Sequence, residues 1–238
     1  MLKEPHEIWK LLPKKDWSER QEYITRLTSY PVVEYRADLE QGIRNDDDAD
    51  VRNAAMEVYR VLGVKGFTSL EALLQDHNHE VRLFVVNILC SIADRGTFPL
   101  LAEAMNDPDV NVRVAAAEAL GKIRDERALS LLEDAIDDEP WVAMAAIDAL
   151  GQIGGEVSFR VLCRCLEMPD IQEYAVAALL QLAEDSDPEV RMEVALVLGS
   201  VALPRALQIL ESMLHDPEVE VRRAAKRSLE KSGKGAKP

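Results

Sequence analysis

The stretch DPDVNVRVAAAEALG, from Asp107 to Gly121, decides the fold because its pattern returns along the whole chain. Each copy has a Val-Arg pair, with an Asp six residues before the Arg; one copy has Ala143 in place of the Arg. The recurring residues are Asp46, Arg52, Asp76, Arg82, Asp107, Arg113, Asp185, Arg191, Asp216 and Arg222. The copies are 30 or 31 residues apart, except for one gap of 48 before Arg191. A fixed period of this length is typical of a repeat array.

Each repeat is predicted to contain two helices. In residues 111–123, apolar side chains recur at helical spacing on one face, which predicts the second helix. Shorter amphipathic stretches over 69–75, 98–105 and 128–136 predict the first helix of three repeats. The repeat Asp suits a helix N-cap, and a following Pro suits the first helical position.

A two-helix unit of this kind cannot bury its apolar stripe alone. Stacked copies bury it between neighbours, which predicts an all-α, right-handed α-solenoid. The repeat Asp is expected to cap a helix, and the repeat Arg to bond the turns and pair with an Asp. This structural ladder is favoured over a catalytic use of the same residues.

The pattern D-x-x-x-x-V-R-x-x-A-A-x-A-L-G resembles HEAT repeats, and in particular the short phycobilisome-lyase HEAT-like class. The resemblance covers about residues 32–231. It implies stacked two-helix repeats and, for most members, a protein-binding scaffold. It also implies three enzymatic alternatives: bilin lyases, a di-iron deoxyhypusine hydroxylase and alkyl-base DNA glycosylases. Fold alone does not choose among these functions.

The spacing predicts a division of the chain into five parts. Residues 1–31 form an N-terminal helical cap, favoured over a dedicated binding segment. Residues 32–154 and 187–231 form two arrays of HEAT-like repeats. Residues 155–186 form an irregular joint with a half-repeat insertion, either a three-helix unit or a repeat that lacks one helix. Residues 232–238 form a flexible basic tail.

Two of the enzymatic alternatives are disfavoured by the residues present. The hydroxylase needs His-Glu pairs in several repeats, whereas the array has only His79-Glu80. The glycosylase needs a basic groove, whereas residues 31–216 carry 35 acidic and 15 basic side chains. Cys163 and Cys165 are two apart on a predicted helix, so buried thiols are favoured over a shared metal ion. No catalytic, cofactor or metal residues are predicted.

Composition adds two expectations about the surroundings of the protein. The acidic body disfavours nucleic acid as a partner. No apolar stretch approaches the roughly 18 residues that a membrane span needs, so a soluble, cytoplasmic protein without membrane contact is expected.

Six side chains are candidates for binding a partner. Four lie five residues after the repeat Arg position and should form an exposed row on the second helices, which line the concave face in this family; the alternative is an ordinary solvated face. Two aromatic residues lie at or near the joint, either as an interaction hot spot or as core filling. The candidates are Glu57, Asn87, Glu118, Asp148, Trp141 and Tyr174. Beyond the joint the row positions hold Leu196 and Arg227.

These features favour a non-enzymatic scaffold or regulatory adaptor. Its acidic concave face is expected to bind a basic segment of a protein partner whose identity the sequence does not specify. The alternative is an accessory subunit similar to bilin lyases, acting on a tetrapyrrole-carrying protein.

Overall fold

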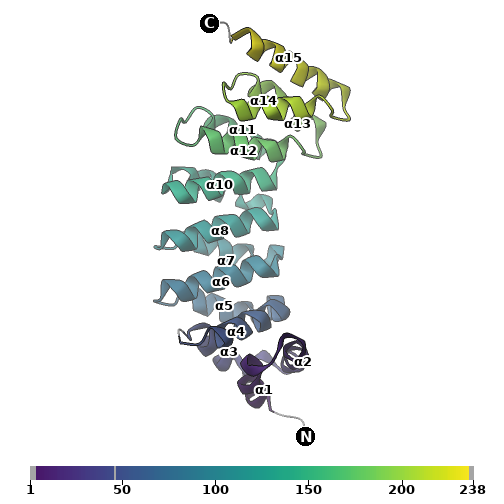
Figure 1. The fold of residues 1–238 in the computed structure, drawn as a ribbon. Coiled ribbons are helices and arrows are strands. Elements are labelled where there is room, and N and C mark those ends of the chain that lie inside the picture. The colour runs from purple at the N-terminus through teal and green to yellow at the C-terminus, as the bar shows by residue number, and fades with distance from the viewer. Residues whose placement is uncertain (1–3, 46, 236–238) are drawn as a thin grey trace. The chain divides into compact units, whose positions relative to one another are not determined.

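A computed structural model describes residues 4–45 and 47–235, which form helices joined by turns and short 3-10 segments (Figure 1). The predicted all-α repeat solenoid is confirmed. By contacts the chain divides into two compact units, Met1–Ala119 and Leu120–Pro238, with the boundary inside α8. Among the described residues, no helix is both long and apolar enough to cross a membrane.

The first unit stacks helix pairs in two layers. Within it, α3 packs on α4 and α5 on α6, while α4 also packs on α6 and α5 on α7. Its helices are α1 (Pro5–Leu11), α2 (Trp17–Leu27), α3 (Arg36–Ile43), α4 (Ala49–Leu62), α5 (Phe67–Leu74), α6 (His79–Ile92), α7 (Phe98–Ala104) and the start of α8 (Val110–Ile123). The predicted N-terminal helices are present as α1 and α2. Trp9 of α1 lies against Gly42, where an added Cβ would be 2.7 Å from the indole ring.

The predicted N-cap position is wrong by two residues in most repeats. The carboxylates of Asp76, Asp107, Asp185 and Asp216 accept the backbone N–H of the residue two further on. The residue two positions after the repeat Asp is the N-cap. Asn78 and Asp187 cap α6 and α13 in this way with their side chains. The repeat Asp therefore shapes the turn and positions the cap, because the turn is longer than the sequence pattern suggested. Asp46 lies outside the described residues.

The second unit contains the rest of the array. Its helices after α8 are α9 (Leu129–Asp134), α10 (Pro140–Ile153), α11 (Gly155–Cys165), α12 (Gln172–Leu182), α13 (Pro188–Leu198), α14 (Pro204–Met213) and α15 (Val219–Gly235). Neighbouring second helices approach closely at glycines. Added Cβ atoms at Gly121 and Gly151 would lie 2.7 Å and 3.0 Å from backbone atoms of Ala149 and Ala178.

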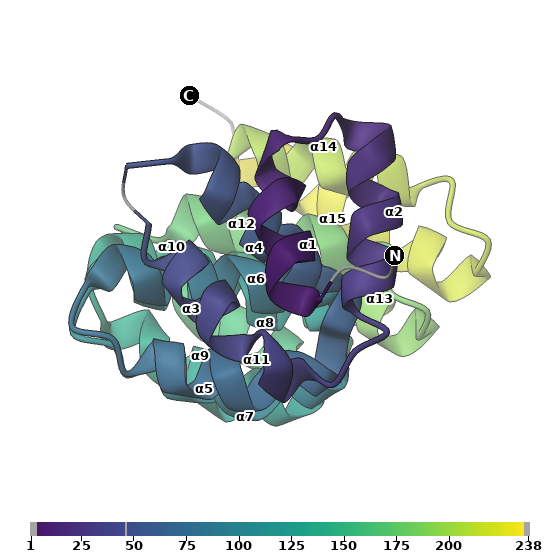
Figure 2. The ribbon, with the colours of Figure 1, turned by 90° about the horizontal axis from the view of Figure 1, so that it is seen from below.

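The irregular joint exchanges the two layers of the second unit. α9, α11 and α13 follow one another on one side, and α10, α12 and α14 follow one another on the other (Figure 2). By its repeat pattern α13 is a second helix, yet it packs against the first helix α11. α14 then packs against the second helix α12, and α15 packs against α13. Successive helices alternate between the two layers, so one additional helix places every later helix in the opposite layer.

The exchange corrects the predicted continuation of the exposed row. Leu196 on α13 and Arg227 on α15 occupy the equivalent sequence positions, but their helices continue the layer of α11. α14 continues the layer of α10 and α12 instead. The tail also differs from the prediction, because residues 232–235 extend α15, where the Ser232 hydroxyl donates to Gly199 O at 3.1 Å. Residues 236–238 of the predicted tail lie outside the described residues.

Candidate interaction surface

Two pairs of the predicted Asp-Arg ladder are present as ion pairs between neighbouring repeats. Arg82 Nε and Nη2 donate to the two carboxylate oxygens of Asp107 at 2.6 and 2.7 Å. Arg191 binds Asp216 in the same way, at 2.8 and 3.0 Å. In both cases the third guanidinium nitrogen donates to the carbonyl of the repeat Asp in its own turn. Each arginine thus joins two consecutive turns.

Arg52 departs from the predicted pairing. Its guanidinium lies over the Phe84 ring at 4.7 Å, and Nη1 donates to Asn45 O at 2.9 Å. Asp76, which corresponds to Asp107 and Asp216 in the two observed pairs, is bound by Arg44 Nε at 2.6 Å. Arg113 and Arg222 donate to the carbonyls of Asp107 and Asp216 in their own turns.

The ladder carboxylates have altered acidity. Burial alone would raise the pKa of Asp107, but the hydrogen bonds from Arg82 and from the Asp109 N–H outweigh burial and lower the pKa. For Asp216, the hydrogen bond from Arg191 is the largest cause and also lowers the pKa. These carboxylates are therefore ionised and paired at neutral pH, which agrees with a structural role.

At the joint the ladder loses its arginine. Ala143 and Ala175 stand at the arginine positions of α10 and α12, so Asp185 has no guanidinium of that kind to pair with. Its Oδ2 accepts the backbone N–H of Gly155 at 2.9 Å instead. Gly155 has a φ of +79°, which an L side chain rarely adopts. The carboxylate thereby fixes the turn between α10 and α11.

The predicted row is only partly available to a partner. In the first unit, Asn87 and Glu118 are exposed. Glu57 is not free, because Arg20 of the cap helix α2 lies 3.4 Å from its Oε1 and its Oε2 is buried. In the second unit, Asp148 is exposed and accepts hydrogen bonds from Gln152 and Gln181 at 2.7 and 2.9 Å.

Both predicted aromatic residues lie on the surface rather than in the core. The exposed fraction is 68 % for Trp141 and 41 % for Tyr174. Trp141 and Asp148 are seven residues apart on α10, which puts them on one face, and Tyr174 and Gln181 have the same spacing on α12. The hydrogen bond between Asp148 and Gln181 joins these two faces. The interpretation of the aromatics as core filling is therefore wrong.

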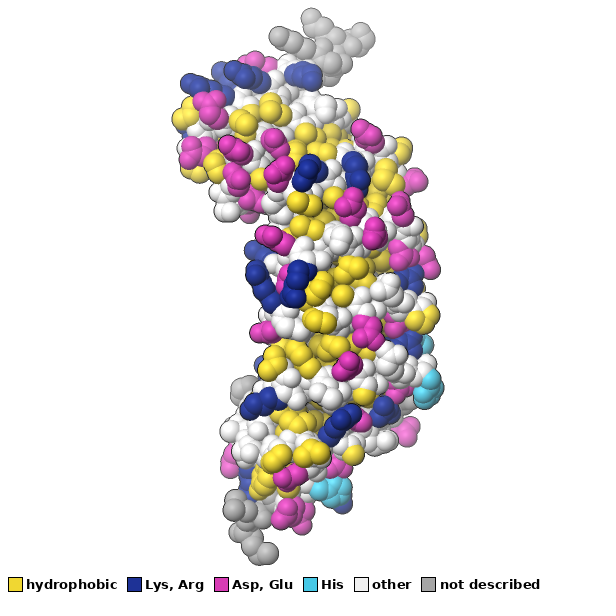
Figure 3. Space-filling view, turned by 180° about the vertical axis from the view of Figure 1, so that it is seen from behind, with side chains coloured by type: hydrophobic (Ala, Val, Ile, Leu, Met, Phe, Trp, Pro, Cys, Tyr) yellow, Lys and Arg dark blue, Asp and Glu magenta, His cyan; other side chains and the backbone are white. Residues whose placement is uncertain are grey.

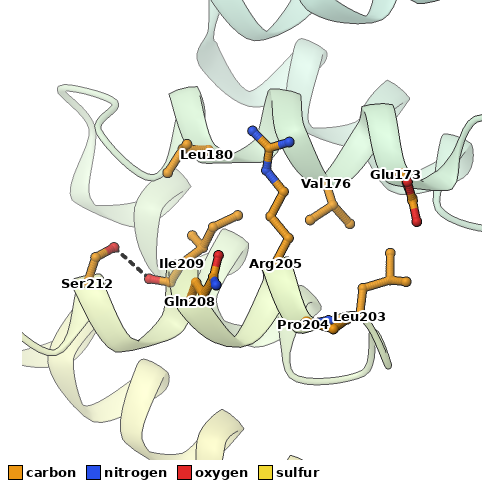
Figure 4. A pocket seen from close by; sticks show the side chains of 9 residues that line it. All are labelled: Glu173, Val176, Leu180, Leu203, Pro204, Arg205, Gln208, Ile209 and Ser212. Carbon is orange, nitrogen blue, oxygen red and sulfur yellow. Dashed lines mark hydrogen bonds between the residues drawn. The ribbon is translucent and has the colours of Figure 1, made fainter.

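An open groove of about 660 Å³ lies between α12 and α14, and none of the six predicted partner-binding residues lines it. Val176 and Leu180 from α12 face Ile209 from α14, and Arg205 extends from α14 toward α12 (Figure 4). Glu173 lies at one end of the groove. The number of predicted helices could have indicated this groove. One helix in excess of whole two-helix repeats exchanges the layers, and this exchange places α14 beside α12.

The reverse face of the molecule carries acidic and basic side chains interspersed among apolar ones (Figure 3). On the first-helix layer of the second unit, Arg164 contacts Glu133 at 2.5 Å and Arg160 contacts Glu156 at 3.8 Å. Opposite charges that pair in this way give little net field to attract a partner. The second-helix layer is thus the better candidate surface.

The cysteines and the acidic groups do not point to a reactive centre. Burial raises the pKa of Cys163 to about 11 and also raises the pKa of Cys165. Both are therefore neutral thiols at physiological pH, and a thiolate is the form that attacks or binds metal. Over residues 4–45 and 47–235, no cluster of three or more His, Cys, Asp or Glu side chains has a metal-binding arrangement.

The chain is similar in sequence to one curated protein over part of its length. The chain is 27 % identical over 155 residues to a protein named uncharacterized phycocyanin operon protein Z, from Pseudanabaena tenuis (strain PCC 7409). The match covers 61 % of this chain and 69 % of that protein.

Solved structures show similarity in fold. The Kap95:Nup1 complex matches with a TM-score of 0.51 and 14 % identity, over 94 % of this chain and 33 % of that chain. The complex of CpcE and CpcF of phycocyanin lyase from Nostoc sp. PCC7120 matches with a TM-score of 0.44 and 19 % identity, over 82 % of this chain and 94 % of that chain. The match to the Kap95:Nup1 complex indicates shared architecture and nothing about the partner.

The repeat itself is identified by its sequence pattern. The pattern of HEAT repeats matches residues 68–142 and 168–230, which together are more than half of the chain. These ranges contain the repeat arginines of α6, α8, α13 and α15. The chain therefore belongs to the HEAT-repeat family.

Proposed function

We propose that this protein is a non-catalytic scaffold that binds a basic segment of a protein partner on its second-helix layer. The observation that carries the proposal is the exposed face of α10 and α12, which combines Trp141 and Tyr174 with the carboxylate of Asp148. Exposed aromatic side chains on a rigid surface are typical anchors of protein interfaces. A carboxylate beside them selects Lys or Arg in the partner.

The arrangement on α10 and α12 favours a segment that contacts both helices. Trp141 and Asp148 are two helical turns, or about 10 Å, apart along α10. The hydrogen bonds from Gln152 and Gln181 hold the Asp148 carboxylate in place before binding. Such pre-organisation lowers the entropic cost of binding. In the first unit, Asn87 and Glu118 give α6 and α8 exposed polar groups of a similar kind.

The binding test uses a fluorescein-labelled octapeptide of alternating Lys and Arg, measured by fluorescence anisotropy. The variant D148K should lower its affinity roughly tenfold, because an attraction is replaced by repulsion. The loss of affinity should shrink as the salt concentration rises, because salt screens the charge. The double variant W141A/Y174A should weaken binding by about thirtyfold if the aromatics act as hot spots.

The matched control is E220K, which changes an exposed carboxylate on α15, outside this layer. It should leave peptide affinity within a factor of two or so, since exposed charges interact weakly at a distance. Circular dichroism should show unchanged helix content for all variants. Equal peptide affinity for wild type, D148K and W141A/Y174A would rule out this surface as the binding site.

A second candidate function is that of an accessory protein acting with a tetrapyrrole-carrying protein. The curated relative, named as a phycocyanin operon protein, favours it. The test is expression in a host that produces tetrapyrroles, followed by purification and absorption spectroscopy. A visible absorption band that co-purifies at a fixed ratio with the protein supports this candidate, and a spectrum with only the protein band near 280 nm opposes it.

A further inference from the structure

We infer that the groove between α12 and α14 is a docking site for an amphipathic helix of a partner protein, with an acidic residue beside its apolar stripe. This inference rests on the proposed scaffold function but uses different side chains. The layer exchange makes α14 the neighbour of α12.

The groove exists because α12 and α14 do not pack as closely as two second helices such as α10 and α12 do. On its other side, α12 lies tightly against α10, where Gly151 meets the backbone of Ala178. α14 is a first helix by sequence, and its buried residues Ala206, Leu210 and Met213 belong to its packing face. The side facing α12 carries Arg205, Gln208 and Ser212. The space between the helices is therefore left open.

The floor and walls of the groove are mainly apolar. Val176 and Ile209 are buried, whereas Leu180 is 37 % exposed. Leu203 and Pro204 close the end near Glu173 (Figure 4). The Ser212 hydroxyl donates to Ile209 O at 2.7 Å, so its proton is already used within α14. Apolar side chains of a ligand would therefore meet apolar partners along most of the groove.

The length of the groove indicates a helical occupant. Its lining runs from Glu173 to Leu180 on α12 and from Leu203 to Ser212 on α14, and both helices run in the same direction in Figure 4. Seven residues of helix correspond to about 10 Å, or two turns. Two apolar side chains at i and i+4 span one turn and would fit between Val176, Leu180 and Ile209. Such a helix would lie over the groove and contact both α12 and α14.

The charges specify the partner further. Within residues 4–45 and 47–235, the Arg205 side chain has no ion pair or hydrogen bond, and it extends over the groove (Figure 4). A helix that covers Arg205 removes its guanidinium from water, and a carboxylate on that helix would offset this cost. Glu173, at the end of the groove, is likewise without a partner among those residues and suits a Lys or Arg one to two turns away.

The test is a display selection of 14-residue helical peptides on the whole protein. The library is first depleted against the variant L180D, so that peptides bound elsewhere are removed. The expected result is enrichment of Leu, Ile or Met at i and i+4, with Asp or Glu next to this stripe. No enrichment, or enrichment without an acidic preference, would overturn the inference.

The enriched peptide then identifies its own site. L180D should lower its affinity at least about tenfold, because a buried leucine contact is lost. L207D is the matched control, since Leu207 is 38 % exposed on α14 but does not line this groove. R205E should lose the acidic peptide and gain a peptide whose acidic residue is changed to Lys. Equal binding of both peptides to R205E would contradict the assignment.

Different variants test the proposed basic-segment site on α10 and α12 and the proposed groove site between α12 and α14. The variants D148K and W141A/Y174A should leave the groove peptide bound, and L180D should leave the basic octapeptide bound. Binding of a small apolar acid such as a bile salt, with no helical peptide enriched, would instead indicate a small-molecule site; pockets of this volume are common for such ligands.

Discussion

The variant D107A is expected to lower the free energy of unfolding by about 3–5 kcal/mol. Arg82 and Asp107 are both buried, and removal of the carboxylate leaves a guanidinium in the interior without its partner. The variant also removes the acceptor for the Asp109 N–H at the start of α8. Urea denaturation followed by circular dichroism at 222 nm gives the change.

The matched control for this prediction is E220A. Glu220 pairs with Arg223 at 2.5 Å, but both side chains are more than 60 % exposed. Water screens such a pair, so the expected change is within about 0.5 kcal/mol. A D107A effect as small as that of E220A would show that the ladder does not hold the repeats together.

The ladder also predicts the response to acid. The pKa values of Asp76, Asp107 and Asp216 are lowered in the folded protein, so the folded state binds protons less readily than the unfolded state. Their stabilisation is fully present above the ordinary Asp pKa of 3.8 and is lost as pH falls through the lower, folded values. In urea titrations from pH 6 to pH 2, D107A should lose less stability than the wild type, because one of these groups is absent. Parallel losses would contradict this assignment.

The variant G121A is expected to destabilise the protein by about 1–3 kcal/mol. Alanine is the better helix former by roughly 1 kcal/mol, so an exposed position would respond in the opposite direction. At Gly121, however, the added Cβ would lie 2.7 Å from the Ala149 Cα. Relief of this clash requires α8 and α10 to move apart, which costs packing energy. Thermal and urea unfolding of wild type and variant measure the difference.

The comparison variant is G151A, at the equivalent place one repeat later. Its added Cβ would lie 3.0 Å from Ala178 O and 3.1 Å from Ala178 Cα, which is tight but less severe. We expect the loss of stability to be larger for G121A than for G151A. The reverse order, or stabilisation by both variants, would show that the helices can separate without cost.

The helices could be predicted from the sequence because their apolar spacing and turn residues agree. The repeat Arg and Asp were also recognised, and Arg82 and Arg191 form the expected pairs. The N-cap was misplaced because Asp107-Pro108 and Asp187-Pro188 look alike, although Pro188 begins α13 and Pro108 precedes α8 by two residues. Only the path of the backbone distinguishes these two registers.

The surface was harder to predict than the core. Exposure of Glu118 and Asp148 follows from helical spacing, but the ion pair between Glu57 and Arg20 depends on how the N-terminal cap folds back on α4. The groove between α12 and α14 depends on a surplus helix, and residue spacing alone shows that surplus without showing which side each helix takes. The spacing of residues along the chain does not show which helices pack together after the joint.

The layer exchange has a consequence for comparing repeats within this chain. Asp148 and Leu196 occupy the same column when the repeats are aligned, yet their helices belong to opposite sides of the second unit. Inserting an odd number of helices reverses the sides, whereas inserting an even number restores them. Residues at equivalent repeat positions before and after α12 therefore pack against different helices. A consensus sequence built from all repeats would combine positions from two different environments.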